Sequence, residues 1–182
     1  MPYIYLTPIE PADISLLEDL SQFVRRAFGV STRIDERRID LDCAYDSQRG
    51  QYNSSKILIQ LVRDNPPSDA LKVLGITHVD LFLPIFTFQF GQAQLDNIGA
   101  LLSTYRLHNR FYGLPDDRAL YLERVEKEAI HELGHTFGLV HCYDPFCVMR
   151  SSTYVEDVDQ KSIEFCGSCA SRLAEKLRSL GR

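Results

Sequence analysis

The stretch HELGHTFGLVHCYDPFC contains three histidines, one glutamate and two cysteines, residue types that bind transition metals or transfer protons: His131, Glu132, His135, His141, Cys142 and Cys147. His131 and His135 are four residues apart, so on a helix both imidazoles project from one face and can bind a single zinc ion. Glu132 adjoins the first histidine, where its carboxylate can reach a water molecule beside that metal. The spacing therefore indicates metal-assisted hydrolysis.

A third imidazole follows a glycine. Gly138 is a natural helix terminator, because glycine adopts the left-handed conformation without penalty. A chain that turns back there can present His141 to the same zinc, which completes the pattern HExxHxxGxxH. Three neutral imidazoles leave the double charge on zinc, so its water can reach a pKa of about 7. Glu132 would then serve as general base and afterwards as general acid.

Four of the five cysteines lie close together near the end of the sequence, at Cys142, Cys147, Cys166 and Cys169. Their spacing, C-x4-C and C-x2-C, is within the range of structural zinc sites, in which four thiolates leave no position for water. Four buried, reduced thiols or a redox pair are the alternatives, although a thioredoxin-like surrounding is missing. We expect two zinc ions, one catalytic and one structural, with adjacent ligands at His141 and Cys142.

Taken together, HELGHTFGLVH, the four cysteines and a methionine two residues after Cys147 resemble the archaemetzincins (archaelysins), a family of the metzincin clan of zinc peptidases. The resemblance implies a peptide substrate, with Glu132 as the base and Met149 as the Met-turn residue. It also implies the two ligand sets: His131, His135 and His141 for catalytic zinc, and Cys142, Cys147, Cys166 and Cys169 for structural zinc. Some metzincins carry a tyrosine two residues after the methionine, whereas this sequence has Ser151.

By the same resemblance, the fold is an α/β (α+β) metzincin-like domain. It has a mixed twisted sheet with an antiparallel edge strand, an active-site helix and a C-terminal region stapled by zinc. The segment FTFQFGQA is similar to the upper-rim edge strand along which metzincins align their substrates. Gly91 and Ala93 carry little side chain, so an extended ligand could approach there; an ordinary strand end is the alternative.

The whole chain of 182 residues is 45% apolar and 25% charged, typical of one globular domain. We divide it into a sheet-and-helix half, residues 1–138, and a C-terminal part, residues 139–182.

Composition also excludes some partners. A net charge of −5 provides no cationic surface for the phosphates of nucleic acid. The apolar run LFLPIFTFQF is too short to span a bilayer, and the N-terminus does not resemble a secretory signal. We expect a cytoplasmic monomer with reduced thiols and no membrane partner.

Hydrophobic periodicity and turn residues predict the elements that position these groups. A helix over residues 13–28 should be capped by Asp13 or Ser15 and end at Gly29. The active-site helix is expected within residues 120–139. The other predicted helices are residues 53–64 and 166–180, and the strands are residues 3–9, 30–39, 71–83, 86–94 and 97–107. In the first half, alternating strands and helices favour a mostly parallel sheet covered by helices.

Three functions compete for these motifs. A metallopeptidase that uses no covalent intermediate comes first, with aminopeptidase and endopeptidase action left open. The histidines also fit H-x3-H-x5-H, which resembles the bacterial zinc endoribonucleases, but Glu132, the cysteines and the acidic balance count against it. A zinc-stabilised module that binds peptides without cleaving them has no need of Glu132. Outside the motifs, we expect His78 in the core or at its rim, His108 in solvent and Cys43 as a buried thiol.

Overall fold

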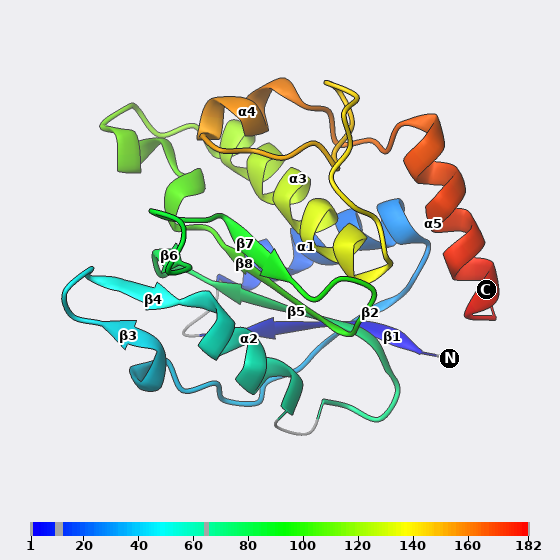
Figure 1. The fold of residues 1–182 in the computed structure, drawn as a ribbon, viewed down its shortest axis with the longest axis horizontal. Helices are drawn as coiled ribbons and strands as arrows, with labels where there is room; N and C mark the ends of the chain where they lie inside the picture. Colours follow the sequence, from blue (N-terminus) through cyan, green and yellow to red (C-terminus); the bar gives the residue numbers. More distant parts are fainter. Residues whose placement is uncertain (1, 10–12, 64–65, 182) are drawn as a thin grey trace.

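A mixed five-stranded sheet lies at the centre of the protein in the computed structural model, which describes residues 2–9, 13–63 and 66–181 (Figure 1). The strand order is β2-β1-β5-β8-β7. The first four strands in that order run parallel, and β7 pairs antiparallel with β8 at the edge. Their bounds are Tyr3–Pro8 for β1, Thr32–Ile34 for β2, Ala70–Thr77 for β5, Gly91–Ala93 for β7 and Gly99–Ser103 for β8. The predicted mixed sheet with an antiparallel edge strand is confirmed.

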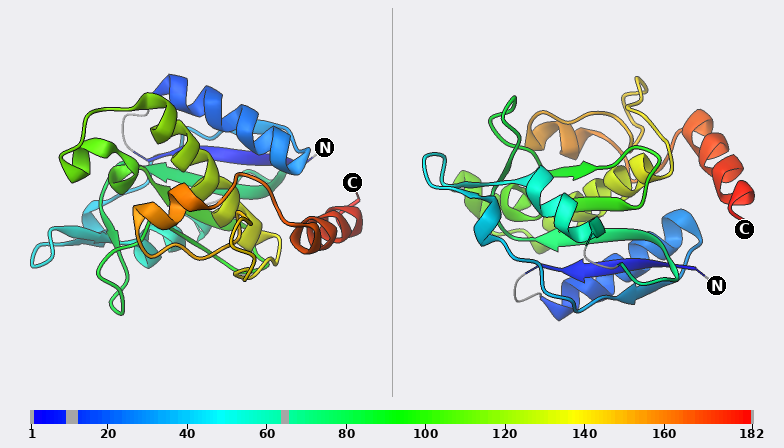
Figure 2. Two further views of the ribbon diagram at one scale, coloured as in Figure 1. Left: turned by 90° about the horizontal axis from the view of Figure 1, so that it is seen from above. Right: turned by 60° about the horizontal axis from the view of Figure 1, so that its bottom comes forward.

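Helices cover both faces of this sheet (Figures 1 and 2). Helices α1 (Ile14–Phe28) and α3 (Arg118–Thr136) pack on one face, where their apolar residues join one core cluster. Helix α2 (Ser54–Arg63) packs on the other face, where Ile57 and Leu61 join a second cluster. Central strands covered on both sides read as continuous apolar runs, which explains the sequence of β5.

Helix α1 has the ends that the sequence predicts. The carboxylate of Asp13 accepts a hydrogen bond from the amide of Ser15, so Asp13 is the N-cap. Gly29 has φ 66°, the left-handed conformation that ends a helix, and its amide donates to the carbonyl of Arg25. An ion pair between Arg26 and Glu126 then joins α1 to α3.

A small second sheet, which the sequence did not predict, lies beside the first. It has the order β3-β4-β6, with bounds Tyr45–Asp46, Gln51–Asn53 and Leu81–Phe82. The run predicted as one strand over residues 71–83 is therefore two strands in different sheets. The break is stabilised by side chains, because Arg106 binds the carboxylate of Asp80 through two nitrogens and Ser103 donates to the carbonyl of Val79. The strand predicted over residues 30–39 was too long, since β2 ends at Ile34.

The strand predicted over residues 86–94 is also mostly wrong. Only Gly91–Ala93 forms a strand, and at the start of the predicted segment the carbonyls bond to side chains instead of to a neighbouring strand. Arg49 donates to the carbonyls of Phe86 and Thr87, and Gln51 donates to that of Thr87. Helix α2 matches its prediction over residues 54–63, while residue 64 lies outside the described residues.

Long loops and two helices follow α3. Helix α4 (Val155–Gln160) was not predicted, whereas α5 (Gly167–Ser179) agrees with the expected terminal helix. Short 3₁₀ helices lie at Asp42–Ala44, Tyr105–Leu107 and Asn109–Tyr112. Within the described part of the chain, no helix combines the length and the apolar character that crossing a bilayer would require.

Candidate metal centres and the cleft beside them

Helix α3 presents two of the three candidate histidines. Its start is capped by Asp117, whose side chain accepts from the amide of Leu120. His131 and His135 lie one turn apart near the other end. The Nδ1 atom of His131 lies 2.9 Å from the backbone carbonyl of Val148. The Nδ1 atom of His135 lies 2.7 Å from that of Leu139. Because a carbonyl accepts a hydrogen bond from Nδ1, each Nε2 is left without its proton and free to bind a metal.

The end of α3 turns the chain back toward these imidazoles. Gly138 has φ 88°, which permits the sharp turn that brings His141 to the site. Buried Lys72 donates to the carbonyl of Thr136 at 2.6 Å and to that of Asn97 at 2.7 Å, so its charge meets the negative end of the helix dipole. Burial lowers the pKa of Lys72 to about 8.

The three imidazoles converge as zinc ligands do. Their nearest ring nitrogens all lie within 4.8 Å of one another, and the Nε2 atoms of His131 and His135 are 3.1 Å apart. Two nitrogens at about 2.0–2.1 Å from a tetrahedral zinc are separated by about 3.3 Å, so this spacing fits the metal. Burial lowers the pKa of His131, His135 and His141, which favours the neutral form that zinc binds.

Glu132 is buried beside this cluster, and a second carboxylate, that of Glu128, lies near it. Burial raises the pKa of Glu132 well above its usual value, and nearby Glu128 raises it further, whereas Lys161 lowers it. A cation at the histidines would favour the carboxylate form of Glu132, because an opposite charge lowers the pKa of a carboxyl group. Glu128 and Lys161 form an ion pair of 2.7 Å that is almost fully buried. Sequence reasoning missed this pair; the only signal was that Glu128 precedes Glu132 by one helical turn.

Two glycines make room for the site. A β-carbon at Gly91 of β7 would lie 2.6 Å from Cγ of Glu132 and 2.6 Å from the carbonyl of Leu101. A β-carbon at Gly134 would lie 2.5 Å from Sδ of Met149, which is fully buried against α3. Met149 therefore packs beneath the helix turn that carries the histidines, next to the residue whose carbonyl orients His131.

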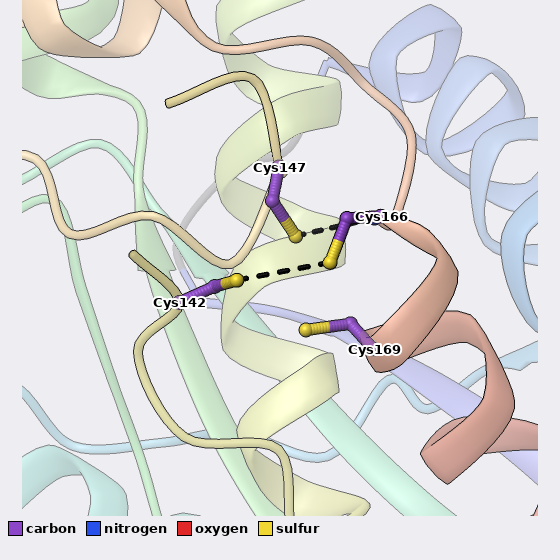
Figure 3. Close-up of side chains that lie close together, drawn as sticks. All are labelled: Cys142, Cys147, Cys166 and Cys169. Atoms are coloured by element: carbon purple, nitrogen blue, oxygen red, sulfur yellow. Dashed lines mark hydrogen bonds between the residues drawn. The ribbon is translucent and has the colours of Figure 1, made fainter. Parts of the chain in front are cut away.

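The four cysteines form a second cluster (Figure 3). Their sulfur atoms all lie within 4.8 Å of one another and belong to free thiols, with 3.7 Å between Sγ of Cys142 and Sγ of Cys166. Two sulfurs on one tetrahedral zinc, each about 2.3 Å from it, are about 3.8 Å apart, so the donors fit zinc and not a disulfide. Cys166 caps α5, and the amide of Cys169 lowers the pKa of the Cys166 thiol to about 7.

Two cavities flank the histidine cluster and share its wall. One, of about 290 Å³, lies between residues 86–91 and residues 151–154, and the other, of about 350 Å³, lies along residues 91–95. Both are lined by His131, Glu132 and His141. The segment at 151–154 was not singled out as a cleft wall by sequence reasoning, because it carries no motif, whereas residues 86–89 belong to the segment FTFQFGQA that was expected to lie along the substrate. Together the cavities form a cleft that passes the candidate metal site.

Of three residues outside the motifs, two differ from expectation and one agrees with it. Cys43 is exposed and not buried, since it lies in a short 3₁₀ helix on the surface. His108 is half-buried and stacks on Tyr121 with 3.8 Å between ring centroids, whereas we expected it in solvent. His78 is exposed at the end of β5 and bonds the hydroxyl of Thr104, in keeping with a rim position.

Comparison with known proteins identifies the family. The model of peptidase family M54 matches residues 25–175. The chain belongs to this family. Among curated relatives, the archaemetzincin of Methanocaldococcus jannaschii is 37% identical over 95% of this chain and 93% of its own length. That of Pyrococcus furiosus is 46% identical over 74% of this chain and 70% of its own.

Solved structures of archaemetzincins agree with the fold. The crystal structure of archaemetzincin from Methanopyrus kandleri superposes with a TM-score of 0.84 at 35% identity, covering 97% of this chain and 96% of that one. That from Archaeoglobus fulgidus, complexed with malonate, has a TM-score of 0.79 at 37% identity and covers 93% and 99%. The predicted archaemetzincin resemblance and the metallopeptidase class are confirmed, in preference to the endoribonuclease and the non-catalytic module. This M54 chain is a zinc metallopeptidase.

Proposed function

We propose that His131, His135 and His141 hold a catalytic zinc ion and that the four cysteines hold a second, structural one. The observation that carries the proposal is the convergence of three imidazoles, two of which have their Nδ1 atoms on carbonyls. A zinc ion held there supplies the Lewis acidity that makes water a usable nucleophile near neutral pH. The cysteine cluster leaves no open position, which suits a structural role.

Glu132 is proposed as the proton carrier. Its carboxylate lines both cavities, so it lies where a water and a peptide carbonyl can meet. In this role Glu132 accepts a proton from the attacking water and then delivers it to the leaving amine. The ion pair between Glu128 and Lys161 lies directly behind it and keeps a second carboxylate from competing for that proton.

The edge strand is proposed to align the substrate. β7 is the outer strand of the main sheet, and its residues 91–93 line one cavity. An extended peptide can pair with such a free edge through its main chain. Glu132 is the one carboxylate among the described residues lining this cavity, and Glu128 in the other is already paired. Neither cavity, as far as its described lining goes, offers a free carboxylate for a terminal amine, so we propose cleavage within a chain.

Two substitutions test the roles of these residues. Glu132→Gln should keep its zinc and lose at least about two orders of magnitude in turnover of a quenched peptide, the usual contribution of a general base. His135→Ala should lose activity together with the catalytic zinc. Glu175→Gln, at an exposed position of α5 outside both cavities, is the control and should behave as wild type. A Glu132→Gln variant that retains zinc and cleaves at near the parental rate would refute the assigned base.

The position of cleavage is tested separately with peptides that differ only at the N-terminus. A quenched peptide with an acetylated N-terminus should be cut at an internal bond about as fast as its free-amine form. Cleavage restricted to the first residue of the free-amine peptide would refute the endopeptidase proposal while leaving the zinc assignment intact.

A further inference from the structure

The outer edge of β7 presents main-chain groups at two positions. The amide of Gln94 donates to the carbonyl of Gly99, where β8 begins. Positions that bond to the neighbouring strand alternate along an antiparallel pair, so Gln92 bonds to β8 as well. The amides and carbonyls of Gly91 and Ala93 therefore point to the open edge, where an extended peptide can bond to them.

These two positions differ in their relation to the candidate metal site. Gly91 lines both cavities together with Glu132, so a bound substrate passes it in either direction. Ala93 is the next position that points outward, and it lines the cavity along residues 91–95. Directly after it, the chain turns at residues 94–98 and enters β8. The placement of this turn therefore decides whether Ala93 lies in line with Gly91 and the metal site.

The turn contacts the end of α3 through its main chain. The amide of Asp96 donates to the carbonyl of His135 at 2.9 Å. Asp96 has φ 54°, and it is the one non-glycine residue with positive φ in the part of the chain that the structure describes. A β-carbon on Gly138 would lie 3.5 Å from the carboxyl group of Asp96, so the turn and the helix end are in contact. An unfavourable backbone conformation of this kind persists where the surrounding structure fixes it.

Lys72 of β5 makes the buried part of the same connection. It is only 6% exposed, and its ammonium group donates both to the carbonyl of Asn97 in the turn and to that of Thr136 at the end of α3. Burying a cation is unfavourable unless hydrogen bonds replace its hydration. Here the bonds come from two segments that are distant in sequence. The ammonium group is therefore satisfied only when the turn and the helix end are both in place.

We propose that Lys72 and Asp96 are positioning residues for peptide cleavage. They fix the turn after β7 on the end of the metal-binding helix, so that Ala93 is held where it can bond to the substrate. Both act through the main chain of β7 and not on the reacting atoms. The inference rests on the alignment of the substrate along β7 that is proposed above. It requires that a peptide long enough to reach Ala93 is a better substrate than one that reaches only Gly91.

Turnover of two quenched peptides by the zinc-loaded protein tests the proposal. Both have the same residues around the scissile bond, and one is extended with alanine at both ends, so that only this one reaches Ala93. For the wild-type protein we expect the extended peptide to have a kcat/KM about tenfold higher, mainly through a lower KM, because it gains main-chain hydrogen bonds.

Lys72→Met should remove this advantage. The kcat/KM of the extended peptide should fall about tenfold, to near that of the short peptide, because Ala93 is no longer held in line. The short peptide and the zinc content should stay near wild type, since the carbonyl of Leu139 still orients His135. Lys56→Met is the matched control: this exposed lysine of α2 also donates to a carbonyl, that of Cys43, and its loss should change neither peptide.

Two variants of Asp96 test the turn without changing Lys72, and they decide the question if Lys72→Met does not fold. Asp96→Gly keeps the amide and permits a positive φ, so the extended peptide should keep its advantage. This change removes an ion pair with Lys176, which contributes little because Asp96 is exposed. Asp96→Pro has no amide hydrogen and cannot adopt φ 54°, so the advantage should be lost.

An extended peptide that keeps its full advantage in Lys72→Met or Asp96→Pro would overturn the proposal. So would an equal loss for both peptides, or a loss of zinc, because either shows a general structural role. Equal turnover of the two peptides by the wild-type protein would refute bonding at Ala93, and this inference with it, while the assignments of zinc and Glu132 would stand. Those assignments fail instead if the wild-type protein cuts neither peptide.

Discussion

Substitution of Gly134 by alanine separates helix propensity from packing beneath the candidate metal site. Gly134 is in the interior of α3, where alanine is ordinarily more favourable than glycine by about 1 kcal/mol. Here the new methyl group would lie 2.5 Å from Sδ and 3.1 Å from Cε of Met149. Met149 is fully buried in the core, so its side chain has no open space into which it can move.

The packing effect should exceed the propensity effect. Overpacking a filled core costs about 1–3 kcal/mol, so we expect Gly134→Ala to lower the free energy of unfolding by up to about 2 kcal/mol. The strain should also reach the metal site, because the carbonyl of Val148, the residue before Met149, orients His131. We therefore expect less bound zinc and lower peptide turnover in the same variant.

Urea denaturation of zinc-loaded protein, with zinc content measured on the same preparation, provides the assay. Gly167→Ala is the matched control, since a β-carbon there would meet nothing within 4 Å, and it should not destabilise the protein. In a Met149→Ala background the substitution of Gly134 should become neutral or stabilising, a coupling of at least about 1 kcal/mol. A gain of about 1 kcal/mol for Gly134→Ala alone would refute the packing of Met149 under this helix.

Three further outcomes are expected. Gly91→Ala should lower peptide turnover at least tenfold with little loss of zinc, because its methyl group would displace Glu132; equal turnover would contradict this close approach. Cys169→Ser should lose one of two zinc ions and melt at a lower temperature, as elemental analysis and calorimetry can show. For Lys72, the pKa of about 8 lies below its ordinary 10.5, so the unfolded chain binds more protons between these values. The free energy of unfolding should therefore rise across that pH range, by at most about 1.4 kcal/mol per pH unit, and Lys72→Met should abolish the rise.

Features that depend on local sequence could be predicted. Asp13 and Gly29 fix the ends of α1 through contacts within a few residues, so the sequence contains the whole signal. The same holds for His131 and His135, whose spacing on α3 follows from helix geometry alone. The predicted clustering of the four cysteines is likewise found in the structure, although two of them come from a different segment.

Features that depend on distant partners could not be predicted. The segment at residues 86–90 alternates like a strand, yet the carbonyls of Phe86 and Thr87 bond to Arg49 and Gln51 from another part of the chain. Glu128 and Lys161 are far apart in sequence and have no recognisable motif, although they form a buried pair behind Glu132. The short strands β3, β4 and β6 are stabilised by pairing with one another rather than by their own composition.

A single peptide bond separates the two ligand sets, because His141 belongs to one cluster and Cys142 to the other. In the proposed two-zinc state, an ion at the cysteines restricts the backbone that must also present His141. The first ion to bind thus orders part of the backbone that the second ion needs, so the second ion binds with a smaller loss of conformational entropy. Thermodynamic linkage makes this help reciprocal, so each ion should raise the affinity for the other by the same factor. The two centres of this protein then bind zinc cooperatively, so that each centre binds its ion more weakly when the other is empty.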